Sequence, residues 1–337
     1  MKVETHGKFS NLTSGEISFL WNTYQFETMA KTVKQHFLQH VDDEQTKNCM
    51  LELEAFCTDV IEKVKYFFQK ANYPIPQGFT EKDVNLSAPR LFSDTLYIEM
   101  LFQTAKLSLP IYQLAFLEMT NEDLQQFYYE TIQRLMKLEM KMKSILIEKG
   151  IFIPTPRIPT PTQISFVKKD SFLAGLFGEK RPLLGLEIAN LVFDAKRNGV
   201  GHAVITGFSQ VAQTKEVKKY FLRGKDIAEK QIEIFMGILH DHDLPTSSTI
   251  WTSEVTNSTV APYSDKLMMQ MITTLISSGI QSYGTAMSMS MRKDLGVIYS
   301  RLIGEVALYA EDGAEILIKN GWMEQPPMAI DRKKLAK

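Results

Sequence analysis

The chain has 337 residues, of which 44% are hydrophobic and 23% charged, and its formal net charge is -1. Such a composition is typical of a folded globular protein, and the length favours roughly two domains. The small charge offers no general attraction to nucleic acid. No apolar run reaches the roughly 18 residues of a membrane-spanning helix, and residues 1–15 lack the apolar core of a secretory signal. We therefore expect a cytoplasmic protein with no membrane span and no nucleic-acid partner.

The sequence repeats itself. Residues 12–156 align with residues 183–327 at a constant offset of 171, without an insertion or deletion. Matching pairs run along the whole unit, from Glu16 and Glu187 near its start to Gly150 and Gly321 near its end. A period of this length is too long for a solenoid, so each copy is predicted to be a whole domain.

Apolar residues within each copy recur at helical spacing, as in the stripe of Leu124, Leu135 and Met142. Thr13 followed by Glu16 resembles a capping box, and Gly150 stands where a left-handed cap would end a helix. We expect four helices in the first copy, at about 14–41, 44–71, 92–119 and 121–149, and four more at the matching positions of the second copy. Pro110 removes a backbone hydrogen bond from the third helix and predicts a kink or break there.

The lengths of the connections predict the topology. Links of two or three residues pair the first helix with the second and the third with the fourth, whereas residues 72–91 form a long connection that should travel the length of the bundle. The predicted fold class is all-α, a tandem duplication of a ferritin-like four-helix bundle with a long crossover between helices 2 and 3. The predicted domains are a first bundle at 1–156, a proline-containing linker at 157–182 and a second bundle at 183–337.

Four stretches carry a resemblance to a known family: Gly78–Asp94, Ser171–Pro182, Gly207–Lys225 and Val255–Met269. In these stretches the chain resembles the uncharacterised duplicated ferritin-like proteins of spore-forming bacilli, which are distantly similar to spore coat protein F. The resemblance covers nearly the whole chain and implies the bundle fold. It implies no site residues, because that family has no established activity and a fold alone does not determine function.

The chemistry most often found in this fold is a carboxylate-bridged pair of metal ions, which needs a Glu-x-x-His motif on each of two helices. The chain has no such motif: Lys65 follows three residues after Glu62, and Met236 three residues after Glu233. We also find no phosphate-binding loop, nucleophile elbow or Cys-x-x-Cys pair. The sequence therefore predicts no catalytic residue, no cofactor and no metal centre.

A fallback set of metal ligands exists in the second copy. It consists of Asp194, His202, Glu233 and Glu305. A network of hydrogen bonds and salt bridges with Arg197 or Lys230 would explain the same side chains without a metal. The six histidines lie mostly near predicted helix ends, where solvent exposure is expected; they are His6, His36, His40, His202, His240 and His242.

The second copy carries small residues inside its helices where the first copy is often bulkier. These are Gly199, Gly201, Gly207, Ser277, Ser278, Gly279, Gly284 and Gly304. Each interior glycine costs roughly 1 kcal/mol relative to alanine, so their accumulation indicates a compensating feature. Close contact between helices is one interpretation, and a ligand cavity in the second bundle is the other.

These patterns predict a non-enzymatic intracellular structural or interaction protein, in the cytoplasm or in the forespore or spore. Its partner would be an unidentified protein or a second copy of itself. Two alternatives belong to other classes: a metal-binding oxidase or store of the ferritin type, and a carrier of a small apolar ligand in the second bundle.

Overall fold

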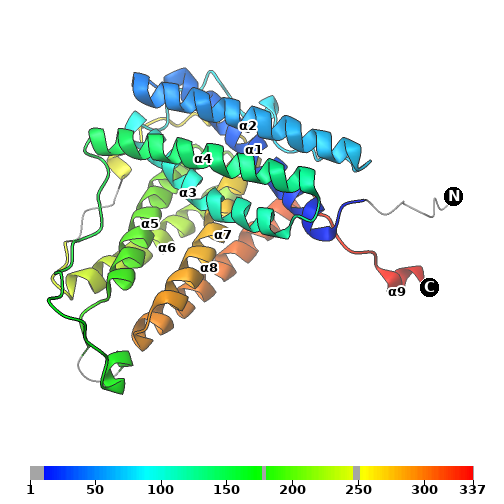
Figure 1. Cartoon of the computed structure of the whole chain (residues 1–337). Coiled ribbons are helices and arrows are strands. Elements are labelled where there is room, and N and C mark those ends of the chain that lie inside the picture. The colour runs from blue at the N-terminus through cyan, green and yellow to red at the C-terminus, as the bar shows by residue number, and fades with distance from the viewer. Residues whose placement is uncertain (1–10, 177–179, 246–250, 337) are drawn as a thin grey trace. The chain divides into compact units, whose positions relative to one another are not determined.

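The computed structural model describes residues 11–176, 180–245 and 251–336, and these residues fold into α-helices without an extended β-strand (Figure 1). The long helices are α1 (Ser14–His40), α2 (Glu44–Lys70), α3 (Asp94–Glu118), α4 (Glu122–Glu148), α5 (Gly185–Val211), α6 (Lys215–His240), α7 (Asp265–Met289) and α8 (Lys293–Lys319). Shorter elements are η1 (Glu81–Asp83), η2 (Asp170–Leu173), η3 (Thr252–Glu254) and α9 (Arg332–Leu335). Among these described helices, none combines the length and apolar character needed to cross a membrane.

The helices repeat at the offset seen in the sequence. α5 begins at Gly185, which the repeat aligns with Ser14 at the start of α1, and both helices contain 27 residues. α7 and α8 stand in the same relation to α3 and α4, and η3 to η1. The predicted all-α duplication is therefore confirmed, with helix bounds that differ from the expected ones by at most two residues at each end.

Local sequence signals mark the starts and ends of the helices as predicted. The Thr13 hydroxyl accepts from the Glu16 backbone N–H, and the Glu16 carboxylate accepts from the Thr13 backbone N–H, which completes a capping box. Gly150 and Gly321 adopt φ values of 68° and 66°, a left-handed conformation that glycine alone takes without steric cost. α3 continues through Pro110. The predicted break is therefore wrong, while a bend at that point stays a prediction.

In each copy, one buried glutamate at the start of the first helix bonds to the backbone between the third and fourth helices. Glu16 accepts hydrogen bonds from the backbone N–H groups of Thr120 and Asn121, between α3 and α4. Glu187, its counterpart in the second copy, accepts from the N–H groups of Met291 and Arg292 in the same way. Burial alone would raise the pKa of each carboxylate, but the donors around it outweigh burial and lower the pKa.

The chain direction in the second bundle follows from contacts at its two ends. The backbone N–H groups of Gln213 and Thr214, just after α5, donate to Asp265 at the start of α7. Arg292, just before α8, donates to Glu187 at the start of α5. α7 therefore begins where α5 ends, so the segment between α6 and α7 must run the length of the bundle. This is the long crossover that the sequence predicts, and α5 to α8 lie side by side in Figure 1.

The residues group into two compact units that draw on both copies. One unit comprises Met1–Leu86, Leu101–Ser144 and Met323–Lys337, and the other comprises Ser87–Met100 and Ile145–Trp322. The division at 1–156 and 183–337 follows the sequence repeat, and as a division into folding units it stays a prediction.

Part of the first copy's crossover belongs to the second unit. Phe92 forms an isolated antiparallel bridge with Val255. The Ser93 N–H donates to the Glu254 carbonyl, and the Thr256 N–H donates to the Leu91 carbonyl, both at 2.9 Å. The Phe92 side chain is fully buried. The second unit therefore includes a segment that precedes α3 in the chain.

The segments that follow the fourth helix of each copy are also exchanged. In the first unit Glu324 accepts hydrogen bonds from the Gln25 side chain at 2.6 Å and from the Gln77 backbone N–H at 2.8 Å. In the second unit Lys196 donates to the Ile153 carbonyl. The repeat aligns Gln25 with Lys196 and Ile153 with Glu324. The exchange thus has the symmetry of the repeat.

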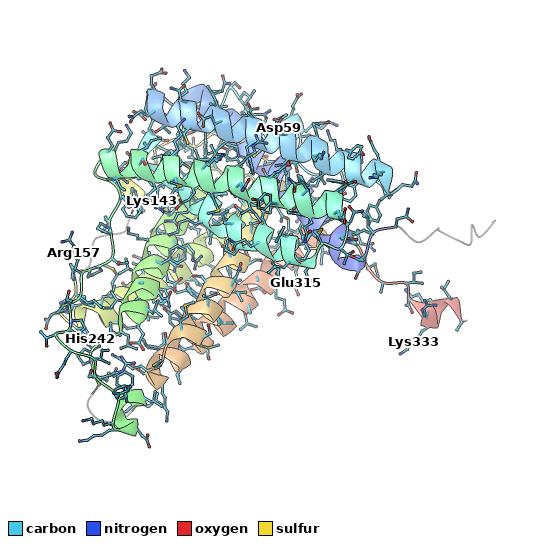
Figure 2. The ribbon with its side chains drawn as sticks, in the orientation of Figure 1. Asp59, Lys143, Arg157, His242, Glu315 and Lys333 are labelled. Atoms are coloured by element: carbon cyan, nitrogen blue, oxygen red, sulfur yellow. The ribbon has the colours of Figure 1, made fainter. Side chains whose placement is uncertain are left out.

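The exchanged tail should protect the backbone it contacts. In Glu324→Ala, the backbone amides of Gln77 and Gly78 lose their acceptor, so both should exchange with deuterium faster than in the wild type. Glu315→Ala is the control, because Glu315 is exposed on α8 (Figure 2). Unchanged protection at residues 77 and 78 in Glu324→Ala would contradict the proposed role of the tail.

Candidate ligand pocket in the second bundle

A pocket of about 70 Å³ lies among α5, α6, α7 and α8. Its apolar lining includes Ile205, Ile227, Ile272, Leu275, Ile276 and Val306, and its polar lining includes Arg197, Asn198, Gln231 and Tyr309. Gly201, Gly224 and Gly279 complete the wall. An engineered cavity of about 150 Å³ holds benzene, so this pocket suits a smaller molecule.

Hydrogen-bonded side chains from three helices form the polar end of the pocket. The Asn198 side-chain amide donates to the Asp194 carbonyl at 2.7 Å and to the Tyr283 hydroxyl at 2.8 Å. The Tyr283 hydroxyl donates in turn to Gln231 Oε1 at 2.6 Å. The network therefore connects α5 to α6 through a tyrosine of α7.

A buried charge pair lies next to this network. The Asp194 side chain is fully buried, and its Oδ1 is 4.0 Å from Arg197 Nε. Burial raises the pKa of Asp194 to about 6, although Arg197 and the Ser282 hydroxyl favour the charged form. Burial raises the pKa of Tyr299, and the charge of Asp194 raises it further. No hydrogen bond of normal geometry joins the two side chains.

Two hydrogen-bond donors of the pocket have no acceptor. Gln231 is 2% exposed and its Nε2 makes no hydrogen bond, and the same holds for Nε of Arg197, which is 8% exposed. Arg197 Nη1 makes one long contact, of 3.4 Å, with the Leu275 carbonyl. A buried donor without a partner costs about 1–3 kcal/mol and calls for an explanation.

Glycines shape the pocket in two different ways. A Cβ at Gly224 would lie 2.1 Å from the Tyr309 hydroxyl, and one at Gly279 would lie 2.9 Å from Arg197 Nη2. A Cβ at Gly201 would have no neighbour within 4 Å. The first two glycines therefore permit close packing, whereas Gly201 faces open space. Close contact between helices, one of the two interpretations from the sequence, fits Gly279, while the ligand cavity stays a prediction.

Tyr309 of α8 packs into the space left by the absence of a side chain at Gly224 on α6. Its ring stacks on that of Tyr220 with centroids 4.2 Å apart and planes 11° from parallel. Each hydroxyl donates to the backbone carbonyl of the other tyrosine, at 3.1 Å and 2.9 Å. The pair forms one rigid side of the pocket.

The first copy has larger apolar side chains at corresponding positions. The repeat aligns Leu53 with Gly224, and Val60 with Gln231. Both Leu53 and Val60 are buried core residues. Sequence analysis missed Gln231 as a site residue, although a polar residue opposite a core valine of the other copy is a signal that could have identified it.

The fallback metal ligands do not come together. Asp194 and His202 are buried on α5, but their separation of eight positions is roughly 12 Å along a helix axis. Glu233 is exposed, and Glu305 forms a 2.6 Å salt bridge with Lys230. Within residues 11–176, 180–245 and 251–336, no three His, Cys, Asp or Glu side chains are grouped so that they could hold a metal ion.

The expected exposure of the histidines is wrong for two of them. His36 is 1% exposed and His202 is 3% exposed. Burial, followed by the charge of Lys225, lowers the pKa of His202. His242, labelled in Figure 2, is partly buried with Nε2 2.7 Å from Arg292 Nη1. His6 lies outside the described residues.

Comparisons with known proteins identify the family but no activity. The profile of a family described as "Protein of unknown function (DUF3231)" matches residues 2–164 and again residues 171–335. The two matches confirm the duplicated family resemblance inferred from the sequence. A comparison with curated proteins finds no match.

One solved structure resembles part of the chain. It is the crystal structure of a candidate spore coat protein from Bacillus halodurans C-125, with 18% identity and a TM-score of 0.41. The alignment covers 44% of this chain and 96% of that one. At this level of likeness the similarity carries no inference about function.

The buried Asp194 carboxyl should make stability depend on pH. The folded protein keeps its proton up to a pH of about 6, whereas an unfolded Asp loses it near pH ~3.9. Stability should therefore fall as the pH rises from about 4 to 6, by on the order of 2–3 kcal/mol. Urea unfolding of wild type and Asp194→Asn across this range measures the difference. The variant should lack that decrease, and identical pH profiles would contradict the assignment.

Two glycine substitutions should have opposite effects on stability. Gly224→Ala forces Tyr309 away from its stacked position and should lower the free energy of unfolding by about 1–3 kcal/mol. Gly304→Ala meets open space and should raise it by about 0.5–1 kcal/mol. Denaturant unfolding of both variants tests this, and a neutral Gly224→Ala would be inconsistent with the described packing.

Proposed function

We propose that this protein binds a small, largely apolar ligand in its second bundle. The chain belongs to the DUF3231 family of proteins of unknown function. The observation that carries the proposal is the pocket around Gly201, Gln231 and Ile276. At two of the positions that correspond to the pocket lining, the first copy has the buried apolar side chains of Leu53 and Val60.

The energetic cost of the pocket supports a ligand. An unfilled pocket leaves its apolar lining without packing contacts and lowers stability. The unpaired donors of Gln231 and Arg197 each add about 1–3 kcal/mol. At the positions of Gly224 and Gln231 the first copy has the buried apolar side chains of Leu53 and Val60, which present no such donor. A ligand that fills the space and accepts those hydrogen bonds would offset these costs.

This proposal is compatible with the broader prediction from the sequence, which is an interaction protein that binds a protein partner or a second copy of itself. Large apolar side chains are exposed on α3 and α4, including Leu117 at 74% and Met140 at 64%. A location in the cytoplasm, forespore or spore rests on the sequence alone. A metal-binding role remains the alternative from another class, and the same protein preparation can test it.

The test of the proposed function is extraction of the purified protein and mass spectrometry of the extract. Wild-type protein should carry a small molecule in stoichiometric amount. Gly201→Leu fills the pocket, because a side chain at position 201 enters open space, and should lose the molecule. Gly304→Leu is the matched control, a glycine-to-leucine change on α8 at a position that does not line the pocket, and should keep it.

The same samples separate the alternatives. No bound molecule in wild type, or the same molecule in equal amount in Gly201→Leu, would contradict the carrier role. Elemental analysis that finds a stoichiometric metal, lost in Asp194→Asn, would favour the metal-binding alternative instead.

A further inference from the structure

We infer that the ligand of the second bundle is a small aliphatic carboxylic acid, with its carboxylate at Arg197 and Gln231 and its hydrocarbon chain among Ile227, Ile272 and Ile276. The inference rests on the proposed function and specifies the chemistry of that same site. The polarity, charge and size of the pocket support it.

The polarity of the pocket calls for a hydrogen-bond acceptor. Gln231 Oε1 already accepts from Tyr283, so the free part of that amide is its NH₂ group. The Arg197 guanidinium can only donate. Asp194 has a free oxygen, but its side chain does not line the pocket. Gln231 therefore presents an unpartnered donor to the pocket and Arg197 a positive charge, so a ligand complementary to them brings acceptor oxygens.

The charge at the polar end favours a carboxylate over an amide or alcohol. Asp194 approaches Arg197 at Nε. The two terminal nitrogens of Arg197 lie against Gly279, where an added Cβ would be only 2.9 Å and 3.0 Å from them. A guanidinium fork matches the two oxygens of a carboxylate, and such charge-assisted bonds are roughly twice as strong as neutral ones.

The apolar wall and the volume limit the hydrocarbon chain. Isoleucines from α6 and α7 and Val306 from α8 surround the space beyond the polar end. The apolar surface of these side chains favours a hydrocarbon chain over a second polar group. The volume is about half that of a cavity that holds benzene, so the acid must have fewer heavy atoms than benzene, which limits it to about two or three carbons. Acetate and propanoate are suitable probes.

Binding of the acid should be coupled to protonation of the Asp194 carboxylate. That carboxylate is faced by Arg197 on its own helix, by Ser282 and Tyr283 on α7 and by Tyr299 on α8. A bound anion at Arg197 would raise the pKa of Asp194 further. The complex would then take up a proton, so affinity for the acid should increase as the pH falls from 7.5 towards 6.

The test is isothermal titration calorimetry on the full chain, with acetate and propanoate as ligands and propanamide and 1-propanol as neutral controls. Either acid should bind the wild type at least about tenfold more tightly than either control. Arg197→Gln should lose that preference, and Arg197→Lys, which keeps the charge but not the fork, should retain part of it. Gly201→Leu should abolish binding, whereas Gly304→Leu should leave it unchanged. In Asp194→Asn the pH dependence should disappear.

The outcomes separate this inference from the proposed function. If propanamide or 1-propanol binds as tightly as propanoate, and Arg197→Gln changes nothing while its circular dichroism matches the wild type, the carboxylate assignment is overturned and the carrier role stands. Absence of binding by both acids also overturns the assignment. If the extraction experiment in addition yields no bound molecule, the carrier role fails as well.

Discussion

Two opposite charges, those of Asp194 and Arg197, are buried together in the second bundle, and the packing around them depends on keeping them there. Removing a charged group from water costs several kcal/mol even beside a partner, so other groups must compensate. The Ser282 hydroxyl donates to Asp194, the Tyr283 ring lies 5.2 Å from the guanidinium, and the absence of a side chain at Gly279 makes room for it. The first copy has Thr23 where the second has Asp194, and its buried carboxylate is instead Glu27, which accepts from the Tyr112 hydroxyl.

The two copies of the duplication differ in the side chains of their cores. The helices of both copies start at equivalent positions of the repeat, so the copies differ in side chains rather than in where their elements begin. Thr23 and Tyr128 form a buried hydrogen bond of 3.0 Å, and the corresponding positions in the second copy hold Asp194 and Tyr299. The exchanged crossover and tail segments mean that each compact unit depends on residues from both copies.

Sequence reasoning predicted what depends on local chemistry. The helices, the capping box at Thr13 and the left-handed Gly150 follow from residues within one turn of each other, and the family resemblance followed from four short stretches. It failed where rotation about a helix axis decides the outcome. The sequence offered Glu233 as a fallback metal ligand together with Asp194, but Glu233 is exposed on α6 whereas Asp194 is buried on α5. The pocket itself could not be located, because it is defined by missing volume among four helices, and a glycine such as Gly201 gives the same sequence signal whether it permits close packing or leaves a space.

The proposed ligand depends on a fillable space beside Gly201 in the second bundle. A crystal structure of the full chain under xenon pressure tests it directly, because xenon enters apolar cavities and is visible by its anomalous scattering. A xenon peak is expected among Gly201, Ile272 and Ile276, in contact with α5 and α7. A map without a peak there would contradict the proposed space beside Gly201.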